Sequence, residues 1–314
     1  MHRHDYPLIS SPPANGWHLM AALMSGAILP SQSWSKTSFR LKFLSRSLLH
    51  WRITHKLLNW LAKHPLLEKI LHAQPNLPCK LHRPYLSAYM NQAAGLAALC
   101  EHYDFIEQRM PPKMRLGYLG STPFVLNQIT GKGGERYTLE LSAIDNLNKE
   151  GEATLLMRNA MGAMLAEITF TLMYYQQKLT LFIGGLQGAK KQVPYIEIPN
   201  ATKACHGLFP KRLVLESITY LAYHLGIHHI MAVSNASHIY QNWRYKRKKR
   251  DVLHADYDQF WLSIGARQLT CGYYQLPTRI TRKRPEDIAS KKRAEYRRRY
   301  QLLDAVEQGI AQHC

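Results

Sequence analysis

The sequence has no cysteine pattern that would build a disulfide framework or a zinc knuckle. Its five cysteines are scattered, with no C-x-x-C pair and no close spacing: Cys79, Cys100, Cys205, Cys271 and Cys314. Small disulfide-rich scaffolds and zinc sites need closely and regularly spaced cysteines. A chain of 314 residues can bury a substantial core without them. This cysteine usage is typical of reduced thiols and predicts a cytoplasmic protein.

The sequence also lacks a hydrophobic run long enough to cross a membrane. Its most apolar N-terminal stretch, residues 16–30, has 15 residues and contains His18, whereas a spanning helix needs about 20 residues. A basic start precedes this stretch, as in a signal peptide, but Asp5 and several prolines interrupt it and no small-x-small cleavage site follows. We expect residues 16–30 to form a buried helix.

Acidic residues are few relative to basic ones. The chain has 41 Lys and Arg against 21 Asp and Glu, a formal net charge of +20. Its hydrophobic content of 46% is that of a globular protein, so the charge lies on a folded body. Such a field attracts polyanions: nucleic acid, anionic lipid headgroups or phosphorylated small molecules such as coenzyme A.

The spacing of apolar residues predicts helices first and strands later. Over residues 35–72 apolar residues recur every three or four positions with basic residues between them, and a second helical run covers 85–108. Between residues 114 and 186 the pattern changes to short runs of β-forming residues separated by turn signals. The predicted strands are 124–129, 137–141, 154–158, 166–175 and 179–186.

The second half of the chain alternates strands and helices. We predict helices at 210–225 and 237–248, on either side of a strand at 230–233, and then strands near 260–264 and 269–275. The helix between the strands at 179 and 230 forms a crossover, so these two strands should be parallel. The predicted fold is therefore α/β (α+β) with a mixed, mostly antiparallel sheet. The expected units are a helical region over 1–112, an α/β domain over 113–277 and a basic C-terminal helical tail over 278–314.

Several motifs after Leu179 resemble one bacterial family. The chain carries LTLFIGGLQG, then ATKACHGLFPKRLVLESITYLAYHLGIHHIMAVSNASHIY, then DYDQFW, GYYQLP and EDIASKKRAEYRRRY. As a set, these motifs resemble the VirK/YbjX family, a group of unknown function from enteric and related bacteria, over roughly residues 80–305. The resemblance implies a link to virulence, stress survival and envelope remodelling, and it implies no established catalytic activity.

The order strand, helix, strand, helix, strand, strand after Leu179 is similar to the second half of a GNAT-type acyltransferase. In that superfamily the loop before the helix offers backbone N–H groups to the pyrophosphate of coenzyme A, and the helix N-terminus adds a positive dipole end. The equivalent loop here, residues 206–212, departs from the family pattern because it has one glycine and because Pro210 lacks an N–H. The resemblance implies coenzyme A or an acyl-CoA as a cofactor.

The first candidate site is this loop before Pro210. One imidazole, one flexible residue and several cations gather at the predicted helix start, which suits an anionic ligand. The ligand-binding candidates are Lys203, Gly207, Lys211 and Arg212, with His206 as a candidate catalytic acid or base. The alternative is an ordinary basic loop in which Gly207 forms a turn and Pro210 begins a helix.

The second candidate site follows the predicted strand at 230–233, because ligands of open α/β sheets sit beyond the carboxyl ends of strands. Ser234 and Asn235 are its ligand-binding candidates, and His238 and Tyr240 its catalytic ones. The alternative is an asparagine turn followed by a serine that caps the next helix.

Two carboxylates, Asp256 and Asp258, are candidate acidic partners. They could orient His206, serve as a base or form ion pairs with neighbouring cations. We expect no metal site, because Gly226 ends the predicted helix between His224 and His228 and no cysteine or carboxylate stands at matching spacing.

Two basic runs, residues 244–250 and 279–300, are interleaved with aromatic residues. Such runs can follow a phosphate backbone or lie on an anionic bilayer, although a solvated helix face has the same composition. We expect residues 279–300, at least from Ser290 onward, to form a surface helix that engages an anionic partner rather than the core.

Three functions stay open at this point. The chain is a GNAT-like acyltransferase or acyl-CoA-binding protein, a non-enzymatic factor that binds anionic membranes or client proteins, or a non-specific nucleic-acid binder. All three predict an anionic ligand or surface as the partner. The expected location is the cytoplasm, including the periphery of the inner membrane.

Overall fold

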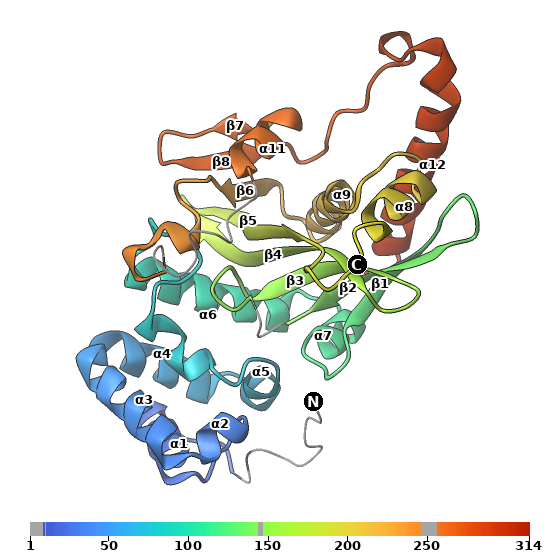
Figure 1. Ribbon diagram of the computed structural model, residues 1–314. Coiled ribbons are helices and arrows are strands. Elements are labelled where there is room, and N and C mark those ends of the chain that lie inside the picture. The colour runs from blue at the N-terminus through green and yellow to red at the C-terminus, as the bar shows by residue number, and fades with distance from the viewer. Residues whose placement is uncertain (1–8, 10, 144–146, 246–255) are drawn as a thin grey trace.

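An eight-stranded sheet forms the centre of the computed structural model, which describes residues 9, 11–143, 147–245 and 256–314 (Figure 1). Its strands lie in the order β1-β2-β3-β4-β5-β6-β8-β7. They are β1 (Phe124–Thr130), β2 (Arg136–Ser142), β3 (Ala153–Asn159), β4 (Met164–Tyr175), β5 (Lys178–Gly188), β6 (His229–Val233), β7 (Arg267–Gln268) and β8 (Tyr273–Leu276). All neighbouring pairs are antiparallel except β5 and β6. The predicted mixed, mostly antiparallel sheet is therefore confirmed.

The parallel pair is joined by the crossover helix α9 (Pro210–His224), as the sequence predicts. Pairing runs from Thr180 opposite His229 to Ile183 opposite Ala232. Beyond this point β5 continues to Gly188, whereas β6 ends at Val233. The two strands therefore part at their carboxyl ends.

Helices cover both faces of the sheet. The helix α6 (Gln92–Gln108) packs on β4 from one face, and α9 packs on β3, β4 and β5 from the other (Figure 1). The last helix, α12 (Arg293–Ala311), lies against α9 and β1. Because both faces are covered, β4 and β5 are buried along almost their whole length.

The N-terminal helices form a further layer beyond α6. They are α1 (Gly16–Ser25), α2 (Gln32–Ser35), α3 (Thr37–Leu49), α4 (Trp51–Lys63), α5 (Leu67–Ala73) and the 3-10 helix η1 (Leu77–His82), and α7 (Pro112–Tyr118) precedes the sheet. The helix α4 contacts α1, α6 and η1, which ties the layer to the rest of the chain. The expected helix at 16–30 forms over α1 and buries Leu19 and Leu23, although Trp17 is exposed. No helix among the described residues is both long and apolar enough to span a bilayer.

One predicted strand, at 260–264, is wrong. These residues belong to helix α11 (Tyr257–Ser263), whose first turn is capped by Asp256 accepting from the Gln259 N–H at 3.1 Å. Trp261 is fully buried on this helix and donates its Nε1–H to Val233 O at 2.8 Å. A short aromatic run fits a strand or a helix equally well, and here the cap and the buried indole favour the helix.

Two further boundaries differ from the sequence prediction. The strand predicted at 269–275 is the second arm of a hairpin formed by β7 and β8. The helix predicted from Ser237 begins instead as a turn, in which Ser237 Oγ accepts from Ser234 N–H, followed by the 3-10 helix η2 (Ile239–Gln241). The rest of that prediction extends into residues 246–255, outside the described residues.

Candidate functional site

The predicted anion-binding loop lies at a hollow of about 700 Å³ between α8 (Glu197–Ala204) and α12. His206 and Gly207 adopt left-handed backbone conformations, with φ of 53° and 80°, which turn the chain from α8 toward α9. The hollow is lined by the predicted Lys203, His206 and Gly207 and, among others, by Lys132, Tyr195, Glu295 and Arg298. Part of the first candidate site is therefore brought together, with cations and one carboxylate around it.

The C-terminal helix covers the backbone of this loop. Arg299 Nε donates to His206 O at 2.8 Å, and a Cβ at Gly207 would collide with the Arg299 guanidinium. Burial, together with the nearby Arg298 charge, lowers the pKa of His206. A pyrophosphate that approached the loop amides at Gly207 would have to displace Arg299.

The other two cations predicted for this site lie outside the hollow that His206 lines. Lys211 packs beside Gly188 at the end of β5, and burial lowers its pKa. Arg212 donates from Nε to Glu216 Oε1 at 2.8 Å within α9, and the Glu216 side chain is buried. The charge of Arg212 is therefore matched inside the protein.

Asn235, Asp256 and Asp258 are joined by hydrogen bonds in the corner between the end of β6 and the start of α11. The Asn235 N–H donates to Asp258 Oδ1 at 2.9 Å, and its Nδ2 donates to Asp256 Oδ1 at 2.9 Å. Its Oδ1 accepts from the Tyr257 N–H at 2.8 Å. Both ends of the Asn235 amide are therefore occupied, and both carboxylates accept hydrogen bonds from Asn235 rather than from His206. This corner fixes the start of α11.

His238 and Tyr240 lie in a buried cluster near the carboxyl end of β5. His238 Nδ1 accepts from the Tyr240 N–H at 3.3 Å, and its ring stacks on Tyr257 with centroids 5.2 Å apart. Burial lowers the pKa of His238 to about 4. Burial and the neighbouring Glu150 carboxylate raise the pKa of the Tyr240 phenol. A neutral imidazole and a protonated phenol thus lie together, but His238 is only 1% exposed.

Protein groups fill the space where β5 and β6 part. The Tyr257 hydroxyl accepts from Leu186 N–H at 3.2 Å. Glu150 lies so close to Gly184 and Gly185 that a Cβ on either glycine would collide with it, and Gln187 Nε2 donates to both Glu150 oxygens at 3.0 Å. A coenzyme entering between the strands would have to displace Tyr257 and Glu150.

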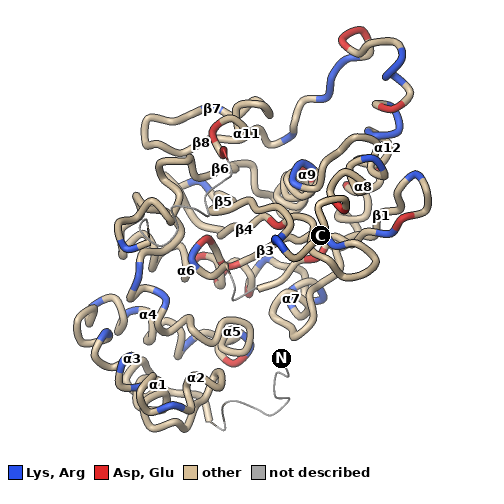
Figure 2. Tube along the Cα trace, viewed as in Figure 1, with Lys and Arg blue, Asp and Glu red and all other residues tan. Residues whose placement is uncertain are grey.

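The N-terminal layer carries cations and no carboxylates over a long stretch. Between residues 6 and 67 the sequence has no Asp or Glu but seven cations, Lys36, Arg40, Lys42, Arg46, Arg52, Lys56 and Lys63. Within the described part of the chain, none of these seven takes part in an ion pair. Figure 2 shows basic positions and no acidic ones along α1 to α4. The local field of this layer is therefore positive.

Large apolar side chains are exposed on the same layer. On α3 the stripe of Leu41, Leu44 and Leu48 repeats at helical spacing, and Leu48 is 64% exposed. Trp17 of α1 is 56% exposed and packs on Trp51, with ring centroids 4.6 Å apart. The described residues that line a hollow of about 440 Å³ there are Trp17, Met20, Ala21, Met24, Leu44, Leu48 and Trp51. We call these seven residues together with Leu41 the N-terminal face.

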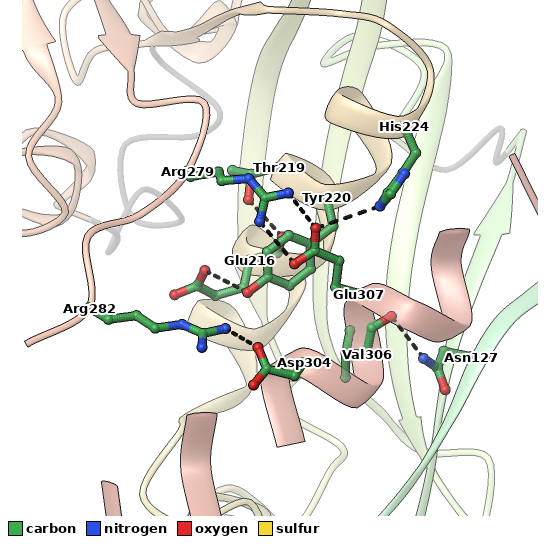
Figure 3. Close-up of polar contacts among 10 residues, drawn as sticks. All are labelled: Asn127, Glu216, Thr219, Tyr220, His224, Arg279, Arg282, Asp304, Val306 and Glu307. Carbon is green, nitrogen blue, oxygen red and sulfur yellow. Dashed lines mark hydrogen bonds and ion pairs between the residues drawn. The ribbon is translucent and has the colours of Figure 1, made fainter. Parts of the chain in front are cut away.

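The basic C-terminal segment is an integral part of the fold (Figure 3). Arg279 and Arg282 form ion pairs of 2.5 Å with Glu307 and Asp304 of α12. Leu303, Val306 and Ile310 of α12 are buried. The 3-10 helices η3 (Pro285–Asp287) and η4 (Ser290–Lys292) precede α12. The predicted exposure is confirmed for Lys291, Lys292, Arg293, Arg297 and Arg298, but it is wrong for Arg299, which is half-buried because it packs on the loop at His206. Binding of an anionic partner by this segment stays a prediction.

His224 and His228 lie on either side of the turn that follows α9. His224 ends α9, and Gly226 with φ of 72° turns the chain before His228. His224 Nε2 lies 3.6 Å from Glu307 Oε1. Within the described ranges, no group of three His, Cys, Asp or Glu side chains is arranged to hold a metal ion.

Comparison with known proteins places the chain in a family. The family model "Protein of unknown function (DUF535)" matches residues 32–312. The chain is 48% identical over 293 residues to "Uncharacterized protein YbjX" of Escherichia coli (strain K12), covering 93% of this chain and 88% of that protein. It is 29% identical over 217 residues to an uncharacterized protein of Haemophilus influenzae, covering 69% of this chain and 70% of the relative. No solved structure matches. The chain therefore belongs to the VirK/YbjX (DUF535) family, whose function is unknown.

Proposed function

We propose that this protein lies on the surface of anionic membranes and contacts them through the N-terminal face. The observation that carries the proposal is the exposed apolar stripe of α1 and α3 within residues 6–67, a stretch that has cations and no carboxylates. Interfacial helices bury such a stripe at the boundary of headgroups and acyl chains, while Lys and Arg reach the anionic headgroups. Tryptophans such as Trp17 and Trp51 prefer this boundary.

The expected energies favour reversible attachment. Burying one leucine side chain contributes about 1.5–3 kcal/mol when burial is complete. A cation near an anionic leaflet contributes about 1 kcal/mol. Leu41 and Leu48, with exposed cations such as Lys36 and Arg52, supply both contributions on the same layer.

Other occupants of this face fit less well. Two copies of the chain meeting through the N-terminal face would bring the unpaired cations of the same layer against each other. Nucleic acid binds through its phosphates and through stacking of its bases, and only Trp17 and Trp51 of the eight residues in the face offer an aromatic ring for stacking. An anionic bilayer matches both the charge and the apolar stripe.

The acyltransferase and acyl-CoA-binding hypotheses have weaker support. The β5-α9-β6 crossover agrees with them. However, Arg299 covers the loop before α9, and Tyr257 with Glu150 fills the space between β5 and β6. Binding of coenzyme A at this place would need both to move.

The test is sedimentation with lipid vesicles. We expect binding to vesicles of phosphatidylcholine with phosphatidylglycerol, weaker binding as salt rises, and little binding to phosphatidylcholine alone. The variant Leu41→Glu/Leu48→Glu should bind at least about tenfold more weakly, because two apolar contacts are lost and two anions are added. Both positions are exposed, so the fold should be retained.

A matched control is Leu262→Glu on α11. Leu262 is exposed as well, at 58%, but it lies outside the N-terminal face. It should bind like the unchanged protein. If the double variant and the control bind equally, the N-terminal face is not the contact surface. Loss of a concentration-dependent dimer in the double variant, seen by light scattering, would assign the face to a second copy instead.

A further inference from the structure

A second, separate group of cations lines a pocket between the N-terminal layer and the sheet. The pocket has a volume of about 230 Å³ and lies between α3, η1 and the turn before β3. Its basic lining residues are Lys42, Arg46, Lys80, His82, Arg83 and Lys149, and its apolar walls include Phe39, Phe43, Pro84 and Tyr85. We call it the basic pocket. None of its lining residues is acidic.

Several cations of the basic pocket are not matched by a carboxylate among the described residues. Lys80 is matched, because its Nζ lies 2.5 Å from Glu152. Lys42, Arg46 and Arg83 have no ion pair and no side-chain hydrogen bond among the residues that the structure describes. These cations come from different segments of the chain, and an anion between them would relieve their mutual repulsion.

His82, which lines the same pocket, has an unused hydrogen-bond acceptor. The residue is 3% exposed, and its Nδ1 has no hydrogen-bond partner among the residues that the structure describes. The Thr54 hydroxyl donates to His50 O at 3.1 Å, so it accepts from Nε2 of His82 at 3.1 Å. The proton of the neutral ring is thus on Nε2, and Nδ1 carries a free lone pair. Burial and the charges of His50, Arg46 and Arg83 lower the pKa of His82 to about 4, which keeps the ring neutral.

We propose that the basic pocket binds a phosphate monoester, with a hydroxyl group beside the phosphate, or the O–H of the phosphate monoanion, donating to His82 Nδ1. The negative charge of the phosphate matches several cations that line the pocket from different segments, and guanidinium groups such as Arg46 and Arg83 bind phosphate oxygens in pairs. The acceptor at Nδ1 selects an anion that also carries a donor. The apolar walls accommodate a short carbon skeleton beside the phosphate.

This site is independent of the N-terminal face. Lys42 and Arg46 lie on α3 one turn apart and line the basic pocket, whereas Leu41 and Leu48 of the same helix belong to the N-terminal face. The phosphate could belong to a free metabolite or to a lipid headgroup. The two sources share one chemistry and are separated by experiment.

Calorimetric titration with glycerol 3-phosphate tests the proposal. We expect saturable binding of glycerol 3-phosphate. Sulfate should bind at least about tenfold more weakly, because it has no hydroxyl group to donate to His82 Nδ1. The variants Arg46→Gln and Arg83→Gln should each weaken glycerol 3-phosphate binding about tenfold. The matched control Arg136→Gln, an exposed arginine of β2, should leave it unchanged.

Lipid and soluble sources are distinguished with vesicles. If the phosphate belongs to a lipid, vesicles with phosphatidic acid, a monoester, should bind more tightly than vesicles of equal charge with phosphatidylglycerol, and Arg83→Gln should remove the difference. If it belongs to a free metabolite, the two vesicles bind alike while glycerol 3-phosphate still binds. The Leu41→Glu/Leu48→Glu variant should retain glycerol 3-phosphate binding in either case. Absence of binding to the unchanged protein, or equal affinities for Arg83→Gln and Arg136→Gln, would overturn the proposal.

Discussion

Replacing Lys80 by methionine is expected to lower the free energy of unfolding by about 3–5 kcal/mol. The Lys80 ammonium lies 2.5 Å from Glu152, and the two side chains are 4% and 0% exposed. Tyr103 donates to the other Glu152 oxygen at 2.7 Å. Burial, the largest single influence, would raise the pKa of Glu152, but the charges of Lys80 and His102 and hydrogen bonds from Lys80 and Tyr85 together outweigh burial, and the pKa lies below its ordinary value. Without Lys80 the protein therefore buries a carboxylate that has lost its counter-charge.

Urea unfolding at neutral pH measures this effect. Lys113, exposed on α7, provides the control, and Lys113→Met should change the free energy of unfolding by less than about 0.5 kcal/mol. The double variant Lys80→Met/Glu152→Gln should recover part of the loss, because it removes both charges. Equal stabilities of Lys80→Met and Lys113→Met would show that the pair contributes nothing.

The sequence predicts those helices and strands whose buried residues recur at regular spacing or form a continuous apolar run. The helix α9 buries residues at every turn, and β4 and β5 are apolar along their length, so periodicity and composition identify both. The crossover then follows from the order of the elements. The prediction fails at α11, where a short aromatic run has no clear period and the Asp256 cap decides the structure.

The candidate sites show the same difference: contacts between residues close in sequence are predictable, and contacts between distant segments are not. Lys203, His206 and Gly207 are close in sequence, and the structure gathers them at one hollow. Pairs that join distant segments, such as Lys80 with Glu152, cannot be predicted from local sequence patterns, because the contact depends on the packing of η1 against β3. Amphipathic spacing likewise predicts α3, but only the finished packing shows that Leu41 and Leu48 stay exposed.

The basic pocket was not predicted for the same reason. Its cations come from residues 42–46, 80–83 and 149, which lie far apart in the chain. The signal that could have drawn attention to part of it is the absence of Asp and Glu between residues 6 and 67. That absence indicates a positive layer, but the position of the pocket follows from tertiary structure alone.

Acid should destabilise the protein between about pH 6.5 and pH 4, because three histidines are buried in their neutral form. Burial is the main cause that lowers the pKa of His82, His102 and His238 to about 4, from an ordinary value of 6.5. The unfolded chain therefore takes up protons at a higher pH than the folded one. Their contribution to stability is complete above pH 6.5 and is lost as the pH falls toward 4. A lowering of this size corresponds to about 3 kcal/mol for each imidazole.

His102 shows why the folded protein resists this protonation. Its Nδ1 accepts from the Leu172 N–H at 3.1 Å, so Nε2 carries the proton and donates to the Tyr118 hydroxyl at 2.9 Å. Tyr118 in turn donates to Glu152 O at 3.0 Å. A second proton, on Nδ1, would face the Leu172 N–H donor inside the core, where no solvent reaches it.

The contribution of His102 is isolated by comparing variants over a pH series. His102→Gln should be less stable than the unchanged protein at pH 7, because the glutamine amide cannot reproduce both hydrogen bonds of the ring. Its free energy of unfolding should then fall less steeply between pH 6.5 and 4, since one group that binds a proton only on unfolding is gone, with a difference in slope approaching about 1.4 kcal/mol per pH unit. The exposed His18→Gln should keep the slope of the unchanged protein. Carboxylate protonation affects all three proteins alike, so identical slopes for His102→Gln and His18→Gln would show that His102 is already charged in the fold.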